Sequence, residues 1–512
     1  MQIDALFESF ENQKEEIAII GIDCTFGAYS GLSEVLELIK GNKTAFSEIP
    51  ERRKQLADLS YQTRKKNYTP IAYMEYIDSF DYEFFNIPKL EARLMDPRQR
   101  LFLQSSWRAI EDSGYSVLDI QQTNMGVFLG LANDGGNDYF QLIKSYEPEM
   151  VGIATAGNIQ SMIASRISYL LNLSGPALVV DTACSSSMVA LHTACQSILN
   201  GDCDSAIVGG VNLKVLPKVD EENLVNIGNT SKDYQVRTFD DQASGTNSGE
   251  GVAAIVVKKL SEAVQDHDHI YAVIKSSAIN QDGKSNGITA PNGAAQEAVI
   301  SKAWEAAGVQ SEDFSFLEAH GTGTKLGDPI EFEALSNVSR RYSSQKNFLP
   351  ISAFKSNIGH LDSLSGLAGI VKAVLCIKNH LIPAGRNFVS PNSSIDFLNS
   401  PLYVNTKVKA YEGNQEMIAG ISSFGLSGTN THVVLKGYKS DEVPNSKSLE
   451  SYPFIFSAVS EESLIHYLNK FKKFVEKTEL TLSDLSYTLN SSRRQCKYRI
   501  SFTADNLDVL NQ

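Results

Sequence analysis

Cysteine is scarce in this chain of 512 residues: there are six, irregularly spaced, and no two form a C-x-x-C pair. That spacing argues against a disulfide framework and a zinc site, and it favours a reducing cytoplasm. Long hydrophobic runs are missing too, since no apolar run reaches the roughly 18 residues that cross a bilayer. Residues 1–16 lack the basic start and hydrophobic core of a signal peptide, and we interpret them as a leader or connector.

Positive charge is in deficit. Lys and Arg number 46 against 60 Asp and Glu, so the formal net charge is -14. A general nucleic-acid binder is excluded, because the neutralisation of phosphates needs a basic field. Two short basic runs, at residues 52–54 and 64–66, are candidates for docking an acidic partner. The alternative is that both runs are solvated loops.

Strand-like apolar runs alternate with helical patterns along most of the chain, which predicts an α/β fold with buried sheets. Two halves share one design: a buried strand, a loop with reactive residues, and an apolar helix. We therefore expect an N-terminal half over residues 17–265 and a C-terminal half over residues 266–438. A polar linker and a small α/β subdomain are expected over residues 439–512, continuing into a longer polypeptide.

The stretch DTACSSS places one thiol, Cys184, between a strand-like run and an apolar segment that predicts a buried helix. Residues 185–187 are expected to cap that helix. A thiol there faces the positive end of the helix dipole, which lowers its pKa, and free N–H groups can hold an oxyanion. The pattern therefore predicts an acylatable nucleophile. Three other cysteines fit the alternative of a small core side chain: Cys195, Cys203 and Cys376.

Two further loops carry a histidine at a strand end, beside glycines that let a backbone approach a ligand closely. They are EAHGTGTKLGDPIE, which contains His320, and KSNIGHL, which contains His360. Either histidine alone would more often be structural. Together with the Cys184 motif they indicate one site.

These residues resemble the ketosynthase domain of modular type I polyketide synthases, within the thiolase-like condensing enzymes. The resemblance covers roughly residues 17–434 and rests on DTACSSS, EAHGTGT, KSNIGH and SSFGLSGTNTH, together with MDPRQR, NQDGKSNGITAPN and GEG. It implies a five-layer α/β/α/β/α fold of two duplicated halves, followed by a flanking α/β subdomain. It also implies a homodimer, paired through the region around Cys184.

The resemblance implies a decarboxylative condensation. Cys184 would take the acyl chain as a thioester, and His320 and His360 would stabilise the enolate that a malonyl extender forms when it loses carbon dioxide. The enolate would attack the Cys184 thioester and give a β-ketoacyl product on the carrier. The second oxyanion would meet the main-chain N–H groups of Cys184 and Leu426.

Supporting roles follow from the same resemblance. Lys355 is expected to pair with Glu331 and to order the histidine loops. Thr322 and Thr324 are expected to hydrogen-bond the pantetheine arm, with structural turn threonines as the alternative. No metal and no permanently bound cofactor is expected, because the phosphopantetheine comes with the acyl carrier protein.

The expected partners are an upstream carrier that donates the acyl chain, a downstream malonyl-loaded carrier, and the other domains of the synthase. Two alternatives keep the fold but change the reaction. A non-elongating domain would only pass or gate the chain; loss of Cys184 or His320 would mark it, and both are present. A branching ketosynthase would add the enolate to an unsaturated chain. A serine hydrolase is disfavoured, because the chain lacks a G-x-S-x-G elbow.

Overall fold

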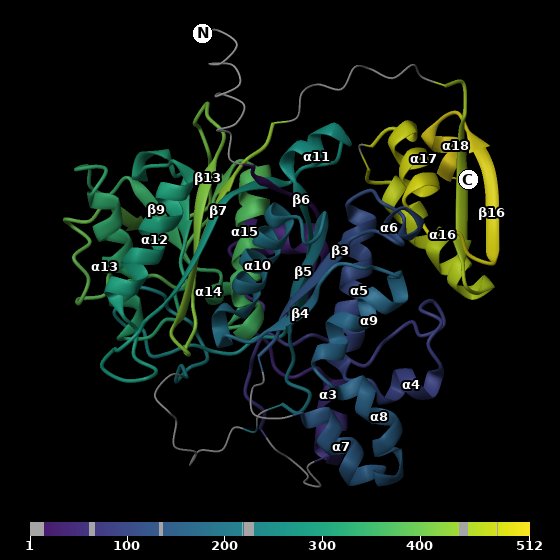
Figure 1. The fold of residues 1–512 in the computed structure, drawn as a ribbon, viewed down its shortest axis with the longest axis horizontal. Coiled ribbons are helices and arrows are strands. Elements are labelled where there is room, and N and C mark those ends of the chain that lie inside the picture. The colour runs from purple at the N-terminus through teal and green to yellow at the C-terminus, as the bar shows by residue number, and fades with distance from the viewer. Residues whose placement is uncertain are drawn as a thin grey trace.

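The computed structural model of the chain describes residues 15–60, 67–132, 137–217, 219, 230–439, 449–478 and 480–511. The main body is built of five layers, which Figure 1 shows side by side. From left to right they are a helix layer, a sheet, a central pair of helices, a second sheet and another helix layer.

The first sheet comes from the N-terminal half, and its central strands are buried on both faces, as their continuous apolar runs predict. The strand order is β1-β6-β5-β3-β4, with β3 parallel to both of its neighbours. The strands are β1 (Ile17–Phe26), β3 (Met125–Gly130), β4 (Ala177–Val180), β5 (Ser205–Asn212) and β6 (Gly251–Lys259).

The second sheet comes from the C-terminal half, in the order β7-β14-β13-β8-β9-β11. Its parallel pairs β13/β8 and β8/β9 bring the ends of these strands to one edge. The strands are β7 (Ala272–Gln281), β8 (Phe316–Glu318), β9 (Leu349–Ser352), β11 (Leu402–Val404), β13 (Ile418–Phe424) and β14 (Thr429–Lys436).

The two sheets are joined at one corner, which the sequence did not indicate. Residues 17–19 of β1 pair antiparallel with residues 272–274 of β7, so the ladder runs on from one half into the other. With the short strand β2 (Tyr29–Ser30), which pairs with β1, the joined sheet has twelve strands. A short separate pair is formed by β10 (Leu381–Ile382) and β12 (Lys409–Ala410).

Two helices form the central layer: α10 (Ser186–Asn200) and α15 (Ser365–Lys378). They contact each other; α10 also contacts strands of both sheets, and α15 contacts strands of the second sheet. Helices in such a layer need apolar residues on nearly all sides. The outer layers consist of α5 (Pro97–Asp112), α9 (Ser161–Leu171), α12 (Gly293–Ala307) and α13 (Gly327–Arg340).

Residues 50–86 give no clear periodicity, yet they begin with the helix α3 (Glu51–Ser60). Within it, Arg53 is buried and paired with Glu250, and Arg52 is paired with Asp78. The run 52–54 is therefore not a continuous exposed basic patch, and the run 64–66 lies outside the described residues. The remaining helices of the main body are α2 (Gly31–Lys40), α4 (Lys89–Leu94), α6 (Val117–Ile120), α7 (Asp138–Tyr146), α8 (Val151–Asn158), α11 (Leu260–Gln265) and α14 (Lys355–Ile358), with the 3₁₀ turns η1 (Pro148–Met150), η2 (Ala183–Ser185), η3 (Ser311–Asp313) and η4 (Asp362–Leu364).

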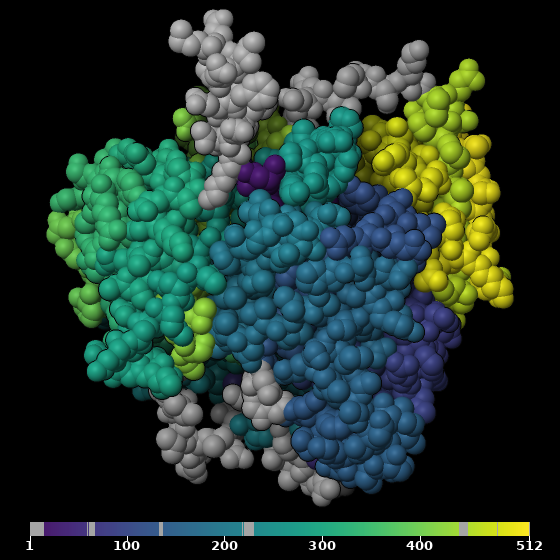
Figure 2. Space-filling model, viewed as in Figure 1, coloured from purple at the N-terminus to yellow at the C-terminus, as the bar shows by residue number. Residues whose placement is uncertain are grey.

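The last segment forms a small α/β subdomain with its own core around Phe454 and Phe456. It packs against the N-terminal half, where Figure 2 shows it in yellow beside the blue surface. One bond across this contact runs from Arg494 Nη1 to the carbonyl oxygen of Phe84, at 2.6 Å. Its elements are β15 (Tyr452–Ala458), α16 (Glu461–Val475), α17 (Leu482–Ser491), β16 (Tyr498–Ala504) and α18 (Leu507–Asn511). Within the described ranges, no helix has both the length and the apolarity to cross a bilayer.

Close packing of β3 against the start of α10 predicts an effect on stability. A Cβ added at Gly130 would lie 2.3 Å from the main-chain nitrogen of Ser187, which is backbone and cannot rotate away. We expect Gly130→Ala to destabilise the fold by at least about 1–3 kcal/mol, as overpacking does, measured as a lowered Tm in thermal unfolding.

The matched control is Gly152→Ala in α8. Nothing lies within 4 Å of a Cβ there, and alanine in a helix is favoured over glycine by roughly 0.5–1 kcal/mol. The control should leave Tm unchanged or raise it. If the two variants unfold at the same temperature, β3 and α10 leave room for a Cβ at Gly130, contrary to the close approach of Ser187.

Candidate active site

Cys184 lies on the 3₁₀ turn η2, between β4 and α10. The residue before it, Ala183, has a φ of 55°, a left-handed conformation that is costly for a residue with a Cβ. Ser186 stabilises the turn: its Oγ accepts from the N–H of Thr182 at 2.9 Å and donates to the carbonyl of Ala183 at 2.6 Å. Ser185, at the N-cap position, donates to the carbonyl of Thr182 instead of accepting from the helix. The expectation that the serines cap α10 is therefore wrong: Ser185 and Ser186 bond within the turn, and Ser187 Oγ accepts from the N–H of Leu367 at 3.1 Å.

The end of β13 and the turn that follows it pack against η2. Ser423 Oγ donates to the carbonyl of Cys184 at 3.0 Å. A Cβ at Gly425 would lie 2.4 Å from the carbonyl oxygen of Thr182, so only glycine allows this approach. The main-chain N–H groups of Leu426 and Cys184 both hydrogen-bond the Cys184 sulfur, and each contact lowers the pKa of the thiol. The structure thus brings together the main-chain N–H groups of Cys184 and Leu426, the two donors that the family resemblance implies for an oxyanion hole.

The predicted lowering of the Cys184 pKa is wrong. Burial raises the pKa of this thiol to about 11, and the nearby carboxylate of Asp362 adds to the rise. The N–H groups of Leu426 and Cys184, together with the Lys355 cation, act in the opposite direction and do not compensate. Cys184 is therefore a thiol at neutral pH, since desolvation outweighs the two N–H groups and the Lys355 charge.

Both predicted histidines face the same space as Cys184. His320 follows β8, and His360 follows α14 through Gly359, whose φ of 78° suits glycine. The two imidazole rings lie edge to face, with centroids 5.9 Å apart. A ring nitrogen of His360, the Cys184 sulfur and a carboxylate oxygen of Asp362 all lie within 4.8 Å of one another.

The tautomer of each ring follows from its main-chain contacts. The N–H of Phe424 donates to Nδ1 of His320 at 3.3 Å, and the N–H of Asp362 donates to Nδ1 of His360 at 2.8 Å. Because a main-chain N–H can only donate, each Nδ1 is an acceptor, and the proton of a neutral ring is on Nε2. Burial lowers the pKa of His320 well below its usual range and the pKa of His360 to about 4. Both rings are therefore neutral donors through Nε2 at pH 7.

Lys355 and Glu331 act on His320 from two sides. The Glu331 carboxylate accepts from the N–H groups of His320 and Gly321 at 2.6 and 2.8 Å. Lys355 Nζ donates to the carbonyl oxygen of His320 and lies 3.3 Å from its Nδ1. The expected direct ion pair between Lys355 and Glu331 is not formed. The two charges attract each other, but each side chain hydrogen-bonds the main chain of His320 instead.

Three further groups stabilise the histidine loops, and their roles are not predicted by any motif in the sequence. Asp328 accepts from the N–H groups of Phe239 and Gly323, and burial raises its pKa to about 7. Glu318 and Lys372 form a buried ion pair at 2.6 Å behind the site. Glu318 and Asp328 lie in the segment EAHGTGTKLGDPIE, but the residue type alone gives no sign that these carboxylates are buried.

A cavity of about 690 Å³ opens in front of these groups. Cys184, His320 and His360 line it, and so do Thr322 and Thr324. The two threonine hydroxyls are 3.1 Å apart, and Thr324 Oγ1 also accepts from the N–H of Gly327. The cavity therefore has room for a linear chain that passes the threonines on its way to the thiol.

The cluster of Cys184, His360 and Asp362 offers three ligand types that a metal could use. Nδ1 of His360 already accepts a main-chain hydrogen bond, however, and the Asp362 carboxylate is paired with Lys214 at 3.1 Å. The positive charge of Lys214 also disfavours a second cation there. The expectation that the site uses no metal stays a prediction.

Three protein-family models match the chain. The one described as "Beta-ketoacyl synthase, N-terminal domain" matches residues 14–263, and "Beta-ketoacyl synthase, C-terminal domain" matches residues 271–389. The chain belongs to the β-ketoacyl synthase family. The third model, "Ketoacyl-synthetase C-terminal extension", matches residues 391–502. The boundaries that we draw at residues 265 and 438 stay predictions.

Its relatives are large polyketide synthases. Polyketide synthase PksL of Bacillus subtilis (strain 168) is 38% identical over 509 residues, which are 98% of this chain and 11% of the relative. PksM of the same organism is 35% identical over 97% of this chain and 12% of the relative. The chain thus spans about a tenth of the length of these relatives.

Solved ketosynthases have the same fold. The ketosynthase from module 6 of the bacillaene synthase of Bacillus subtilis 168 is 38% identical, with a TM-score of 0.86, over 97% of this chain and 83% of the other. The oxazolomycin ketosynthase domain OzmH KS7 of Streptomyces albus JA3453 is 29% identical, with a TM-score of 0.88, over 97% and 88%. The thiolase-like fold is confirmed, and with it the assignment as an acyl-transferring condensing enzyme. Ketosynthase domains of this family carry no cofactor of their own, since the phosphopantetheine belongs to the carrier protein.

The raised pKa predicts how the thiol reacts. Thiolate is the reactive form, so alkylation of Cys184 by iodoacetamide should accelerate about tenfold per pH unit between pH 7 and pH 9. Peptide mapping by mass spectrometry gives the rate at each cysteine. The five others are buried and should label far more slowly: Cys24, Cys195, Cys203, Cys376 and Cys496.

Asp362→Asn removes a negative charge that raises the Cys184 pKa, and should make labelling at pH 8 faster. A labelling rate that levels off at pH 7–8 in the unmodified chain would show that the helix dipole outweighs burial, contrary to our assignment.

Proposed function

We propose that this ketosynthase elongates an acyl chain by decarboxylative Claisen condensation, with Cys184 as nucleophile and His320 and His360 as donors to the enolate oxygen. The observation that carries the proposal is the state of the two rings. Each is neutral, and each Nδ1 is occupied by a main-chain N–H, so Nε2–H is left for a ligand in the cavity that Cys184 lines.

Loading is a thioester exchange. The Cys184 sulfur forms a bond to the acyl carbonyl carbon while the bond from that carbon to the pantetheine sulfur breaks. The proton that Cys184 loses ends on the departing pantetheine thiol, so a thiol with a pKa of about 11 needs no permanent base. The main-chain N–H groups of Cys184 and Leu426 stabilise the oxyanion between the two states.

Condensation begins with the malonyl extender on a carrier protein. Its carbon–carbon bond to the carboxylate breaks, carbon dioxide leaves, and the electron pair becomes an enolate whose oxygen accepts from Nε2–H of His320 and of His360. The enolate carbon forms a bond to the acyl carbonyl carbon while the bond from that carbon to the Cys184 sulfur breaks. The β-ketoacyl product stays on the carrier, and the Cys184 thiolate takes up one proton from solvent. A neutral donor suits this step, because it needs no prior protonation.

Four further residues have supporting roles in this proposal. Glu331 and Lys355 position His320 through its main-chain N–H and carbonyl groups. Thr322 and Thr324 hydrogen-bond the pantetheine arm as it passes them toward Cys184.

The presence of Cys184 and both histidines favours elongation over a domain that only transfers or gates the chain. A branching ketosynthase would use the same three groups and differ in the acyl chain it receives, so the product distinguishes the two. The relatives are large polyketide synthases, which supports upstream and downstream carrier proteins and other synthase domains as partners. The proposal includes a cytoplasmic location, where the six free thiols stay reduced.

We also propose a homodimer formed through β4. This strand ends the joined sheet, and among the described strands it pairs only with β3, which leaves one edge unpaired. Leu178 of β4 is 44% exposed, and Tyr169 of α9, which packs on this strand, is 81% exposed. An unpaired edge flanked by apolar side chains suits a second copy of the same strand.

His320→Ala separates loading from condensation. Acyl loading of Cys184 should stay largely intact, because the donors to its oxyanion are main-chain groups. Formation of the β-ketoacyl product should fall by about 10²–10³, as when one oxyanion donor is deleted. Intact-mass spectrometry with an acyl thioester and malonyl-loaded carrier protein follows both steps.

Cys184→Ala should abolish both steps, and His466→Ala, an exposed histidine in α16, should change neither. If His320→Ala blocks loading as fully as Cys184→Ala does, His320 is the base for the thiol and the division of roles is wrong.

The dimer predicts a mass of twice the 56.1 kDa of the chain in light scattering at micromolar concentration. Leu178→Lys should shift the mass toward a single chain, because it places a charge at the paired edge. Val389→Lys, at an apolar position that is 88% exposed in the other half, is the matched control and should stay dimeric. A monomer in the unmodified chain would refute the proposal.

A further inference from the structure

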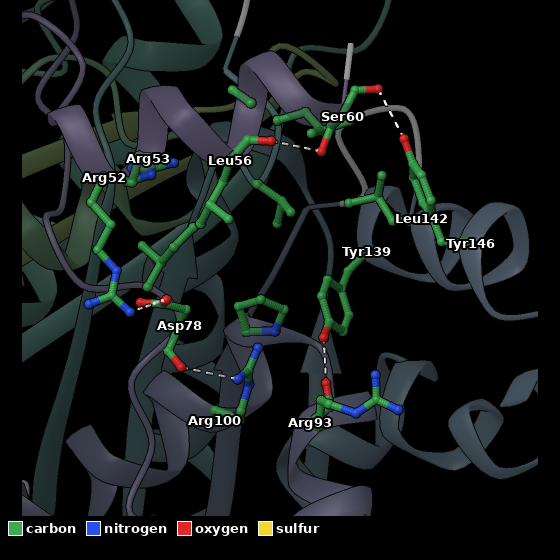
Figure 3. A pocket seen from close by; sticks show the side chains of 15 residues that line it. Arg52, Arg53, Leu56, Ser60, Asp78, Arg93, Arg100, Tyr139, Leu142 and Tyr146 are labelled. Atoms are coloured by element: carbon green, nitrogen blue, oxygen red, sulfur yellow. Dashed lines mark hydrogen bonds and ion pairs between the residues drawn. The ribbon is translucent and has the colours of Figure 1, made fainter. Parts of the chain in front are cut away.

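A second cavity, of about 520 Å³, lies in the N-terminal half between α3, α5 and α7 (Figure 3). It shares no lining residue with the cavity around Cys184. Leu56, Leu142 and Leu216 give it an apolar wall, and the rings of Tyr139 and Tyr146 border it. Four arginines also line it: Arg52, Arg53, Arg93 and Arg100.

Three of the four arginines have a carboxylate of their own. Arg52 pairs with Asp78 at 2.6 Å, which Figure 3 marks at the edge of the cavity. Arg53 forms two hydrogen bonds to the carboxylate of Glu250. Arg93 forms two to Glu147, the second at 2.7 Å. Their charges are therefore compensated within the chain.

Arg100 is different. It is 7% exposed, and no carboxylate lies within ion-pair distance of its guanidinium among the described residues. Nη1 makes one long contact, 3.5 Å, with the main-chain carbonyl of Asp78, and Nε is buried without any partner. The centre of the Tyr139 ring lies 5.7 Å from the guanidinium carbon of Arg100. Figure 3 shows the Arg100 side chain directed from α5 toward the cavity. Asp96 and Asp78 attract this cation from longer range, but burial outweighs them and lowers the pKa of Arg100. A buried cation that no described carboxylate pairs directly costs free energy, so this cavity favours an anion.

The charge balance selects the kind of anion. Within the described part of the chain, one guanidinium of this cavity has no ion-pair partner, which matches a single negative charge. A phosphate monoester carries about -1.5 to -2 at pH 7 and would need a second cation. A guanidinium also matches the planar geometry of a carboxylate. The apolar wall opposite Arg100 calls for an apolar body on the same molecule.

We propose that this cavity binds a monocarboxylate with an apolar body, its carboxylate against the guanidinium of Arg100 and its body among Leu56, Leu142 and Leu216. Arg100 belongs to the MDPRQR motif, which takes no part in the proposed condensation. The site is independent of the Cys184 chemistry, so either can be wrong without the other.

The test is calorimetric titration of the whole chain with sodium octanoate, after alkylation of Cys184 with iodoacetamide to obstruct the other cavity. We expect saturable binding at one site. Arg100→Met keeps the length of the side chain and removes its charge, and should weaken binding at least about tenfold. Arg340→Met, on the exposed end of α13, removes the same charge elsewhere and should leave binding unchanged.

Octanol, with the same body and no charge, should bind at least about tenfold more weakly than octanoate. Octyl phosphate should bind no more tightly than octanoate; if it binds more than tenfold more tightly, the carboxylate assignment is overturned. The proposal is also overturned if octanoate does not bind, or if Arg100→Met and Arg340→Met bind it alike.

Two measurements keep the test decisive if Arg100→Met folds poorly. Leu142→Trp places a large ring in the cavity and should abolish octanoate binding while Arg100 is retained; unchanged binding contradicts the site. In thermal unfolding without ligand, Arg100→Met should be at least as stable as the unmodified chain, because it removes a buried charge that has no ion-pair partner among the described residues. A large loss of Tm would show that Arg100 already has its counterion in the fold, and would overturn the proposal.

Discussion

The carboxylate of Glu331 accepts from two consecutive main-chain N–H groups, those of His320 and Gly321, and the geometry of the site depends on this bidentate contact. It fixes the backbone where β8 ends. Lys355 then binds the carbonyl side of the same residue, so His320 is held through its main chain from both directions. Because Glu331 is on α13 and Lys355 on α14, the contact also ties an outer helix to the loop that carries His360. A ring anchored in this way keeps its orientation whether or not a substrate is bound.

The same dense packing that fixes the rings sets the charges. Desolvation moves all three reactive groups toward their neutral forms: it raises the pKa of Cys184 and lowers the pKa of both histidines. A site of neutral groups has little electrostatic attraction for stray ions, and it can still donate hydrogen bonds when negative charge develops. In the mechanism that we propose, the N–H groups around Cys184 then stabilise a transient oxyanion rather than a resident thiolate.

Much of this arrangement could be predicted from the sequence, because it depends on local order along the chain. The buried strands show as continuous apolar runs, and the motifs place Cys184 and His320 after strands β4 and β8. The expectation that His360 also ends a strand is wrong, because it follows the short helix α14. What depends on neighbours far apart in the sequence could not be predicted. The sign of the Cys184 pKa shift depends on how completely other segments bury the thiol. Lys355 and Glu331 both hydrogen-bond the main chain of His320, in place of the expected direct pair. The corner where β1 meets β7 is a pairing that no periodicity reports.

The central helix α10 has consequences for how such chains can be recombined. It packs on strands of both halves and on α15, so neither half has a complete interior without the other. A crossover between two related chains placed anywhere from β1 to β14 would therefore combine a helix from one parent with the sheet of another. Recombined synthases should tolerate junctions outside this span far better than junctions within it. The segment to exchange is therefore the whole five-layer body rather than either half.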